Sequence, residues 1–175
     1  MYRYESGQTK VKGECRVDGK KIVVKAQGAK RVNVNDPRAV TEALAYQGVL
    51  AVSVDATHWK NYASGIMTNC TRAYVPDYGM YEVTTNHAVT LVSYGQANEK
   101  LGYWKIQNSW GHSWGIDGMI FLERKLGGQA EGQFIDMSPK DGVACKDDPD
   151  TPYVVAGTCG VLSNVWYPFG VEYLP

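Results

Sequence analysis

The chain has 175 residues, with 18 basic and 18 acidic side chains, 44% apolar residues and 11% aromatic residues. This balance suits one ordinary globular domain and argues against a disordered chain or one that binds nucleic acid through its charge. No apolar run is long enough to span a membrane, and the first residues lack the order of a signal peptide, so we expect any export signal to lie outside this chain.

Two regions in the first third of the chain predict strands. Residues 20–34 hold β-branched side chains on both sides of Gln27-Gly28, which indicates two strands around a turn. Residues 49–54 form a short, almost wholly apolar run with β-branched members. Such a run predicts a strand that is buried on both faces.

A helix is predicted between these two regions. Asn35 or Asp36 can cap its first turn, and Pro37 stands where the first helical residue tolerates proline. An apolar stripe follows and ends at Gly48. These signals place the helix over about residues 37–47.

A hairpin is predicted in the middle of the chain. Two strand-like segments, 87–94 and 103–108, are joined by the polar residues 96–102. Antiparallel pairing about Glu99, the centre of that connection, sets His87 opposite Gly111. Gly111 is about three residues from Asn108, an offset that a bulge or an uneven loop absorbs. We therefore expect His87 and Asn108 to meet in space.

The rest of the chain alternates between strand and loop signals. Residues 119–122 predict another strand, and strand character returns over 159–168. Between them, residues 125–157 are predicted to form a long surface excursion. Its acidic stretch 147–150 lacks the glycine and the final glutamate of an EF-hand loop, so we interpret it as a solvated turn rather than a calcium site.

The cysteines of this chain allow two interpretations, disulfides or buried free thiols. The four cysteines are Cys15, Cys70, Cys145 and Cys159. They show no Cys-x-x-Cys spacing and no ligand-like histidine nearby, so we expect no metal site. An even count is compatible with disulfides in an oxidising compartment, and buried free thiols are the alternative. The triplet Asn69-Cys70-Thr71 fits the N-glycosylation pattern, which agrees with secretion.

A series of short motifs runs along the chain. The main members are Val52-Ser53-Val54-Asp55-Ala56, Asn86-His87-Ala88-Val89, Gln107-Asn108-Ser109-Trp110-Gly111, Trp114-Gly115 and Cys159-Gly160-Val161. In this order they resemble the papain-like cysteine peptidases. The resemblance covers most of residues 2–124 and returns over 157–168, and the excursion between has no clear counterpart.

The resemblance implies an α+β fold that is mainly β. It would be the right-hand domain of the papain-like fold, an antiparallel, barrel-like sheet with one or two short helices and long loops. Residues 1–175 would form this half of the full catalytic fold, with 125–157 as a long loop insertion within it.

The resemblance also assigns roles to the motif residues. His87 would be the imidazolium that stabilises an attacking thiolate and then gives its proton to the leaving amine. Asn108 would orient the imidazole without adding a negative charge. Trp110 would cover the hydrogen bond between them, and Trp114 would line the leaving-group side of the cleft. Taken singly, each of these residues has an ordinary structural explanation; the ordered series favours the catalytic interpretation.

Four further positions match the places where the family lines the pocket for the second residue before the scissile bond. They are Ser53, Thr85, Ala88 and Asn164. Thr85 and Asn164 would bring hydrogen-bonding groups where relatives commonly carry apolar side chains. The resemblance therefore implies a mixed pocket.

The thiols are assigned by the same resemblance. Cys70 and Cys159 would be the disulfide of this half, Cys15 would bond a cysteine of the other half, and Cys145 has no family partner. Nothing in the chain matches the segment that carries the nucleophile, which we expect about 40 to 60 residues ahead of Met1 or on a separate chain.

The sequence therefore predicts a subunit or fragment of a cysteine peptidase that hydrolyses peptide bonds by a Cys-His-Asn mechanism. Its expected partners are a complementary left-hand domain or chain carrying the nucleophilic cysteine, with Cys15 as a candidate link, and a peptide or protein substrate. No cofactor, metal, nucleic acid or membrane is implied, and the expected location is lysosomal, vacuolar or secreted. The alternative is a catalytically silent relative that serves as a binding or structural subunit, with 125–157 as an interaction surface.

Overall fold

The computed structural model describes residues 9, 11, 13–14, 22–127, 129–140 and 150–174. The chain divides into two compact units, residues 1–29 with 168–175, and residues 30–167. In the smaller unit, β1 (Val24–Lys25) pairs antiparallel with β13 (Glu172–Tyr173). Within the described ranges, no helix is long and apolar enough to cross a membrane.

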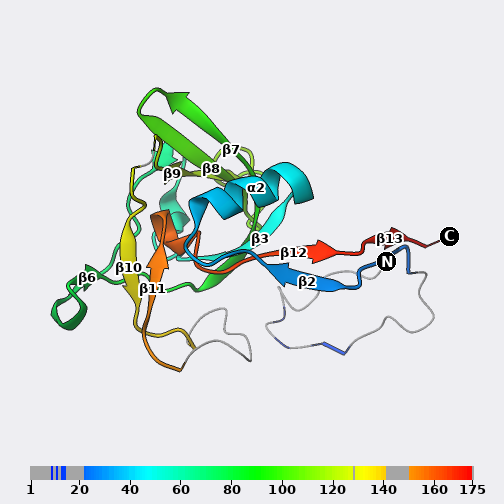
Figure 1. The fold of residues 1–175 in the computed structure, drawn as a ribbon, viewed down its shortest axis with the longest axis horizontal. Coiled ribbons are helices and arrows are strands. Elements are labelled where there is room, and N and C mark those ends of the chain that lie inside the picture. The colour runs from blue at the N-terminus through cyan, green and yellow to red at the C-terminus, as the bar shows by residue number, and fades with distance from the viewer. Residues whose placement is uncertain are drawn as a thin grey trace. The chain divides into compact units, whose positions relative to one another are not determined.

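The larger unit is built on a seven-stranded sheet with the order β2-β12-β3-β7-β8-β9-β4 (Figure 1). Its strands are β2 (Gly28–Arg31), β3 (Leu50–Val54), β4 (Ile66–Met67), β7 (His87–Asn98), β8 (Leu101–Gln107), β9 (Met119–Arg124) and β12 (Val165–Phe169). The central strands pair antiparallel, and β4 joins β9 in parallel. The predicted class, mainly β with one helix, is confirmed. In the described residues the edge strands β2 and β4 do not pair with each other, so the barrel-like sheet is not a closed barrel.

The helix α2 spans Pro37–Gln47, as predicted, and packs on β3 and β7. The Asp36 side chain caps it by accepting hydrogen bonds from the backbone N–H groups of Arg38 and Ala39, at 2.9 and 3.1 Å. The helix ends at Gly48, whose φ of 88° lies in the region that favours glycine.

The strands β1 and β2 form in the region predicted for two strands, but they are not partners of one another. β1 pairs with β13, and β2 lies beside β12 in the large sheet. The prediction of a local strand pair was wrong because local β-propensity carries no information about a partner more than a hundred residues away. The strand predicted over 159–168 is also shorter, since residues 158–160 form the 3₁₀ turn η3 (Thr158–Gly160) and β12 begins at Val165.

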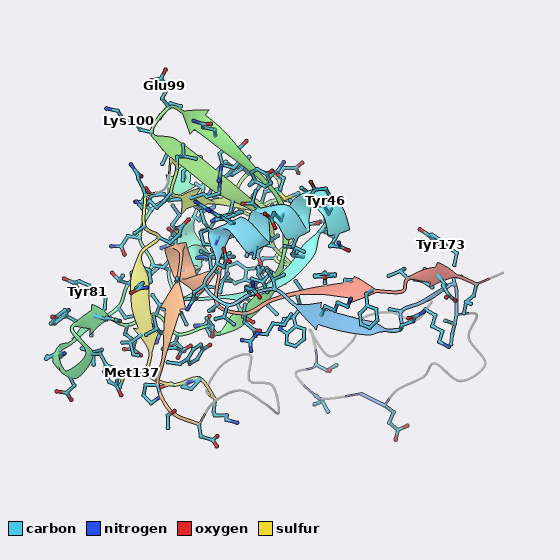
Figure 2. The ribbon with its side chains drawn as sticks, viewed as in Figure 1. Tyr46, Tyr81, Glu99, Lys100, Met137 and Tyr173 are labelled. Atoms are coloured by element: carbon cyan, nitrogen blue, oxygen red, sulfur yellow. A yellow bond between two sulfur atoms is a disulfide. The ribbon has the colours of Figure 1, made fainter. Side chains whose placement is uncertain are left out.

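The predicted hairpin is present and longer than expected. β7 and β8 continue to a tight turn whose tip carries Glu99 and Lys100 (Figure 2). The register shifts twice along β7, between Leu91 and Ser93 and between Gln96 and Asn98. Register shifts of this kind are one of the two adjustments that the predicted pairing allowed.

The excursion 125–157 contains a strand pair that the sequence analysis missed. β10 (Gln133–Asp136) pairs antiparallel with β11 (Tyr153–Ala156), and Ile135 and Val155 are fully buried. Four-residue strands give too few alternating positions to be recognised by pattern. Before β7, the chain forms β5 (Tyr74–Val75), η2 (Pro76–Tyr78) and β6 (Met80–Tyr81). The acidic residues 147–149 lie outside the described residues.

The core lies between the sheet, α2 and the turns η1 (Trp59–Asn61) and η3. Its largest fully buried side chains are Trp59, Trp104, Leu50, Leu91, Ile106, Ile120, Ile135, Leu122 and Leu162. The disulfide Cys70–Cys159, which the resemblance implied, closes a sequence separation of 89 residues beside this core. The indole N–H of Trp59 donates to Cys159 Sγ at 3.4 Å, so the disulfide and the largest buried ring are directly joined.

The disulfide is expected to stabilise the fold mainly by restricting the unfolded chain. Replacing both members (Cys70→Ala with Cys159→Ala) should lower the free energy of unfolding by up to about 4 to 5 kcal/mol, the chain-entropy value for a loop of this length. Urea unfolding of the oxidised protein and of the variant measures the difference. Reductant should destabilise the parent and leave the variant unchanged; equal sensitivity of the two would contradict this assignment.

Trp59 should be one of the most costly core positions to truncate. Its side chain is fully buried, so Trp59→Ala should lower the free energy of unfolding by about 3 to 5 kcal/mol through lost burial and a residual cavity. The control is Tyr46→Ala on α2, whose residue is 83% exposed and which should change stability by less than about 0.5 kcal/mol. Chemical denaturation of both variants tests the contrast.

Candidate active site

His87 is the first residue of β7, where the chain leaves a loop and enters the sheet. It pairs with Val54, the last residue of β3, in the antiparallel ladder. The preceding residue, Asn86, donates its backbone N–H to the Val54 carbonyl at 3.0 Å, and its side-chain oxygen accepts from the N–H of Ala56 at 3.0 Å. The backbone on both sides of the imidazole is therefore fixed by β3 and the loop that follows it.

Asn108 follows the last residue of β8 and is held by the neighbouring loop. Its backbone N–H donates to the Gly118 carbonyl at 2.9 Å, and the residue is 8% exposed. Its Oδ1 lies 2.9 Å from His87 Nε2. The structure thus brings together the two residues that the hairpin argument predicted to meet.

The hydrogen bonds around Asn108 decide which nitrogen of His87 carries the proton. The backbone N–H of Ser109 approaches Asn108 Oδ1 at 2.8 Å and can only donate, so this side-chain atom is the amide oxygen. His87 Nε2 must then be the N–H that donates to it. In the neutral ring, Nδ1 keeps its lone pair, and among the described residues it has no hydrogen-bond partner, so it is able to accept a proton.

Three tryptophans form a cluster beside this imidazole, and two of them contact it. The Trp110 ring lies 5.3 Å from the His87 ring with an interplanar angle of 34°, and Trp59 meets His87 edge-on at 6.0 Å. Trp114 stacks on Trp59 at 6.1 Å, and its indole N–H donates to the Trp59 carbonyl at 3.2 Å. Trp110 and Trp59 therefore pack against the imidazole and restrict its movement.

Trp59 is the aromatic member that the sequence analysis missed. It lies outside the motifs and looks like an ordinary core residue. Its ring contacts His87, Trp110 and Trp114 together, which makes it the centre of the cluster. The only local signal is an aromatic residue close after the predicted strand at 49–54, which is too weak to assign a role.

Asp55 is a second residue that sequence reasoning left without a role. It is 1% exposed, and its carboxylate accepts from the backbone N–H groups of Thr57 and Thr84 at 2.9 and 3.0 Å. Arg72 Nε pairs with it at 3.1 Å, and Asn86 Nδ2 lies 3.4 Å away. This buried carboxylate joins three loops directly before His87, so it positions the strand that carries the imidazole.

The four residues matched to a substrate pocket differ in exposure. Ala88 is exposed, while Ser53, Thr85 and Asn164 are 6, 6 and 9% exposed. Asn164 donates from Nδ2 to the Ser53 hydroxyl at 3.2 Å and accepts at Oδ1 from the Trp166 indole N–H at 2.6 Å. The polar atoms of this pair are therefore engaged with protein groups.

Thr85 is held by the excursion that follows β9. Both its backbone N–H and its hydroxyl donate to one carboxylate oxygen of Asp136, at 2.9 Å each, and Asp136 is fully buried at the end of β10. Its methyl group lies on the side of Gly160, where an added Cβ would approach it to 3.2 Å. The excursion therefore determines the orientation of a residue two positions before His87.

The remaining predicted positions are placed as follows. Asn69 is exposed, and its side-chain oxygen accepts from the N–H and the hydroxyl of Thr71 at 2.8 and 2.7 Å. Cys70 and Cys159 are bonded to each other, and Cys15 and Cys145 lie outside the described residues. Across the described ranges, no group of three or more histidine, cysteine, aspartate or glutamate side chains is arranged to hold a metal.

Known proteins share both the sequence pattern and the fold. The model of the papain family cysteine proteases matches residues 1–133. A viral cathepsin of Heliothis zea nuclear polyhedrosis virus is 33% identical over 112 residues, which cover 64% of this chain and 28% of that relative. A silicatein of Petrosia ficiformis is 31% identical over 119 residues, covering 66% and 32%. This chain thus spans about a third of these relatives' lengths.

The fold comparison points in the same direction. The bromelain protease of Ananas comosus, solved in complex with the inhibitor E64, matches 96% of this chain and 60% of its own, with 25% identity and a TM-score of 0.66. A digestive procathepsin L2 of Tenebrio molitor, 23% identical with a TM-score of 0.65, shares the fold. With its family-model match, its ordered motifs and its β-rich papain-like fold, this chain belongs to the papain family of cysteine proteases.

Proposed function

We propose that this chain supplies the histidine and the asparagine of a cysteine peptidase, and that the nucleophilic cysteine comes from a segment or chain outside these 175 residues. The observation that carries the proposal is the hydrogen bond between His87 Nε2 and Asn108 Oδ1, at 2.9 Å. It leaves Nδ1 as the ring atom that exchanges a proton with a thiol. The two thiols that the structure describes, Cys70 and Cys159, are consumed in a disulfide.

The proposed chemistry divides hydrolysis into two steps. His87 Nδ1 takes the thiol proton, the thiolate attacks the peptide carbonyl, and the imidazolium returns the proton to the leaving amine as an acyl-thioester forms. Water then attacks the thioester while His87 Nδ1 takes its proton, the C–S bond breaks, the carboxylic acid product leaves, and the proton returns to the thiolate. Asn108 holds the ring in both steps, and its neutral amide lets the imidazolium pair with the thiolate alone.

The expected location is a lysosomal, vacuolar or secreted compartment. A disulfide beside the core supports it, because such bonds persist in oxidising surroundings. Asn69 supports it as well, since its side chain is exposed in a sequon. The substrate is a peptide or a protein that lies across the exposed side of Trp110 and Ala88.

A catalytically silent relative is the second candidate. One relative carries the name silicatein, which is not the name of a protease. Reading the gene ahead of Met1 distinguishes the two. Gln and Cys-Gly-Ser-Cys-Trp in that stretch would favour the enzyme, and serine or glycine at the nucleophile position would favour a binding or structural subunit.

Activity should depend steeply on the proposed pair. In the natural protein, with its complementary half, His87→Ala should lower kcat/KM for a peptide substrate by about 10²- to 10⁴-fold, and Asn108→Ala should lower it less because the ring remains but loses its orientation. His112→Ala, whose side chain is 89% exposed, is the matched control and should retain activity. Labelling by a thiol-reactive epoxide such as E64 should slow most in His87→Ala, less in Asn108→Ala and not in His112→Ala. If the epoxide labels no cysteine associated with the unmodified protein, the proposal is contradicted.

The 175 residues alone should associate in solution. Trp110, which packs on the imidazole, is 42% exposed, and Ile116 in the loop after Trp114 is 40% exposed. The proposed complementary half would cover such apolar surface. Light scattering coupled to gel filtration should find oligomers that diminish with Ile116→Ser or when the complementary half is added. A monodisperse parent monomer, unaffected by either change, would count against a missing half.

A further inference from the structure

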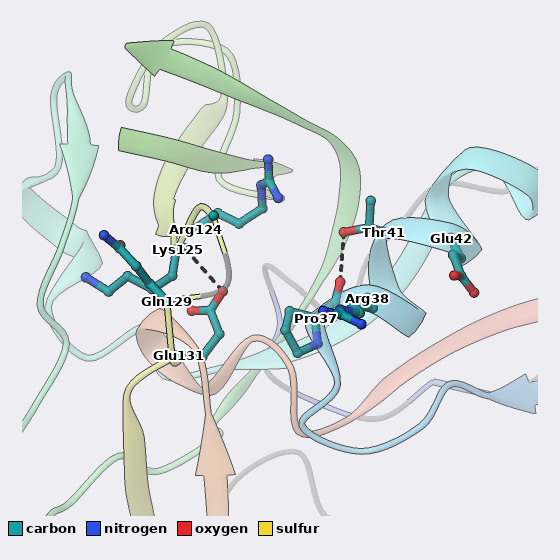
Figure 3. A pocket seen from close by; sticks show the side chains of 9 residues that line it. Pro37, Arg38, Thr41, Glu42, Arg124, Lys125, Gln129 and Glu131 are labelled. Carbon is teal, nitrogen blue, oxygen red and sulfur yellow. Dashed lines mark hydrogen bonds between the residues drawn. The ribbon is translucent and has the colours of Figure 1, made fainter. Parts of the chain in front are cut away.

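A cavity of about 350 Å³ lies between the first turn of α2 and the end of β9, within the larger unit. It is lined by Pro37, Arg38, Thr41, Glu42, Arg124, Lys125, Gly127, Gln129 and Glu131. Figure 3 shows Arg124 and Lys125 on one side of it and Pro37, Arg38 and Thr41 on the other. None of these residues belongs to the cluster around His87, and the volume suits a small ligand rather than a peptide segment.

Arg124 is the strongest sign of a ligand in this cavity. Its guanidinium carbon lies 5.1 Å from the Tyr94 ring and 5.4 Å from the Trp104 ring, so two aromatic faces hold the cation in place. Its Nε is buried without a hydrogen-bond partner, and in the described part of the chain Arg124 forms no ion pair. Nε itself is too deeply buried for a ligand to reach. The terminal N–H groups of the same guanidinium form no hydrogen bond with the described residues, and an anion in the cavity would supply acceptors for them.

Further positive potential comes from the opposite wall. Arg38 is exposed at the start of α2, and no described residue pairs with its guanidinium. The first turn of α2 adds the positive end of the helix dipole. Lys125, by contrast, is already paired with Glu123 at 2.6 Å. The cavity thus places two unpaired guanidinium groups on facing elements.

Two carboxylates also line the cavity, and removing their negative charge should change anion binding in a predictable direction. Glu131 accepts a hydrogen bond from the backbone N–H of Lys125 at 3.2 Å, and burial raises the pKa of its carboxyl above the usual value. Glu42 lies on α2. In the ionised form both compete with a bound anion for the arginines, so neutralising Glu131 should favour anion binding.

We propose that this cavity binds a small oxyanion, either a carboxylate or an inorganic sulfate or phosphate, between Arg124 and Arg38. The planar guanidinium groups provide paired N–H donors that match two oxygens of such a group. The site is separate from the proposed peptidase centre and requires no nucleophile. Its success or failure is therefore independent of the proposed function.

The test is a titration of the full chain, joined to its complementary half where that is known, with succinate, sulfate or phosphate at constant ionic strength. Isothermal titration calorimetry should show saturable binding of at least one of them. Arg38→Gln removes one donor pair at an exposed position and should weaken that binding about tenfold, the usual effect of losing a charged hydrogen bond. Lys100→Gln, which removes an exposed cation at the hairpin tip, is the matched control and should not.

Two more variants separate binding from general electrostatics. Arg124→Lys keeps the charge but not the planar fork and should weaken binding, whereas Glu131→Gln should strengthen it several-fold at neutral pH. Binding of succinate alone assigns a carboxylate ligand, and binding of sulfate or phosphate alone an inorganic one. Absence of saturable binding to every probe, or equal weakening by Arg38→Gln and Lys100→Gln, would overturn the proposal.

Discussion

The hydrogen bond between His87 Nε2 and Asn108 Oδ1 is the constraint on which the site depends. It forms only if β7 begins at His87 opposite the end of β3, and if the chain turns away from β8 at Asn108. The Ser109 N–H then fixes the amide orientation, and through it the imidazole tautomer. A single backbone donor therefore determines which ring nitrogen is free for chemistry.

The aromatic cluster connects this site to the stability of the domain. Trp59 contacts the imidazole, receives the indole N–H of Trp114 at its carbonyl, and donates its own indole N–H to Cys159 Sγ. The disulfide with Cys70 thus lies one side chain away from the proposed catalytic ring. We expect changes that loosen the disulfide to displace the His87 ring through Trp59, because well-packed interiors transmit small displacements.

Two buried carboxylates organise the approach to β7. Asp55 accepts hydrogen bonds from two backbone N–H groups and pairs with Arg72. Asp136 accepts hydrogen bonds from the N–H and the hydroxyl of Thr85. Both are satisfied by several donors, which offsets the cost of burying a charge. Asp136 belongs to β10, so the excursion without a counterpart in the motif series is part of the support for this region. Through Asp136, this excursion fixes the position of Thr85, two residues before His87.

Local sequence determined α2 almost to the residue, because Asp36, Pro37 and Gly48 are signals read within a single turn. It also indicated that His87 and Asn108 would meet, since a hairpin joins segments close in the chain. Tertiary structure alone decided the partners of β1 and β2, the roles of Trp59 and Asp136, and the meeting of Arg38 with Arg124 around one cavity. These depend on contacts between residues far apart in sequence, whose free energy appears only when the whole core has packed, and no local pattern records them.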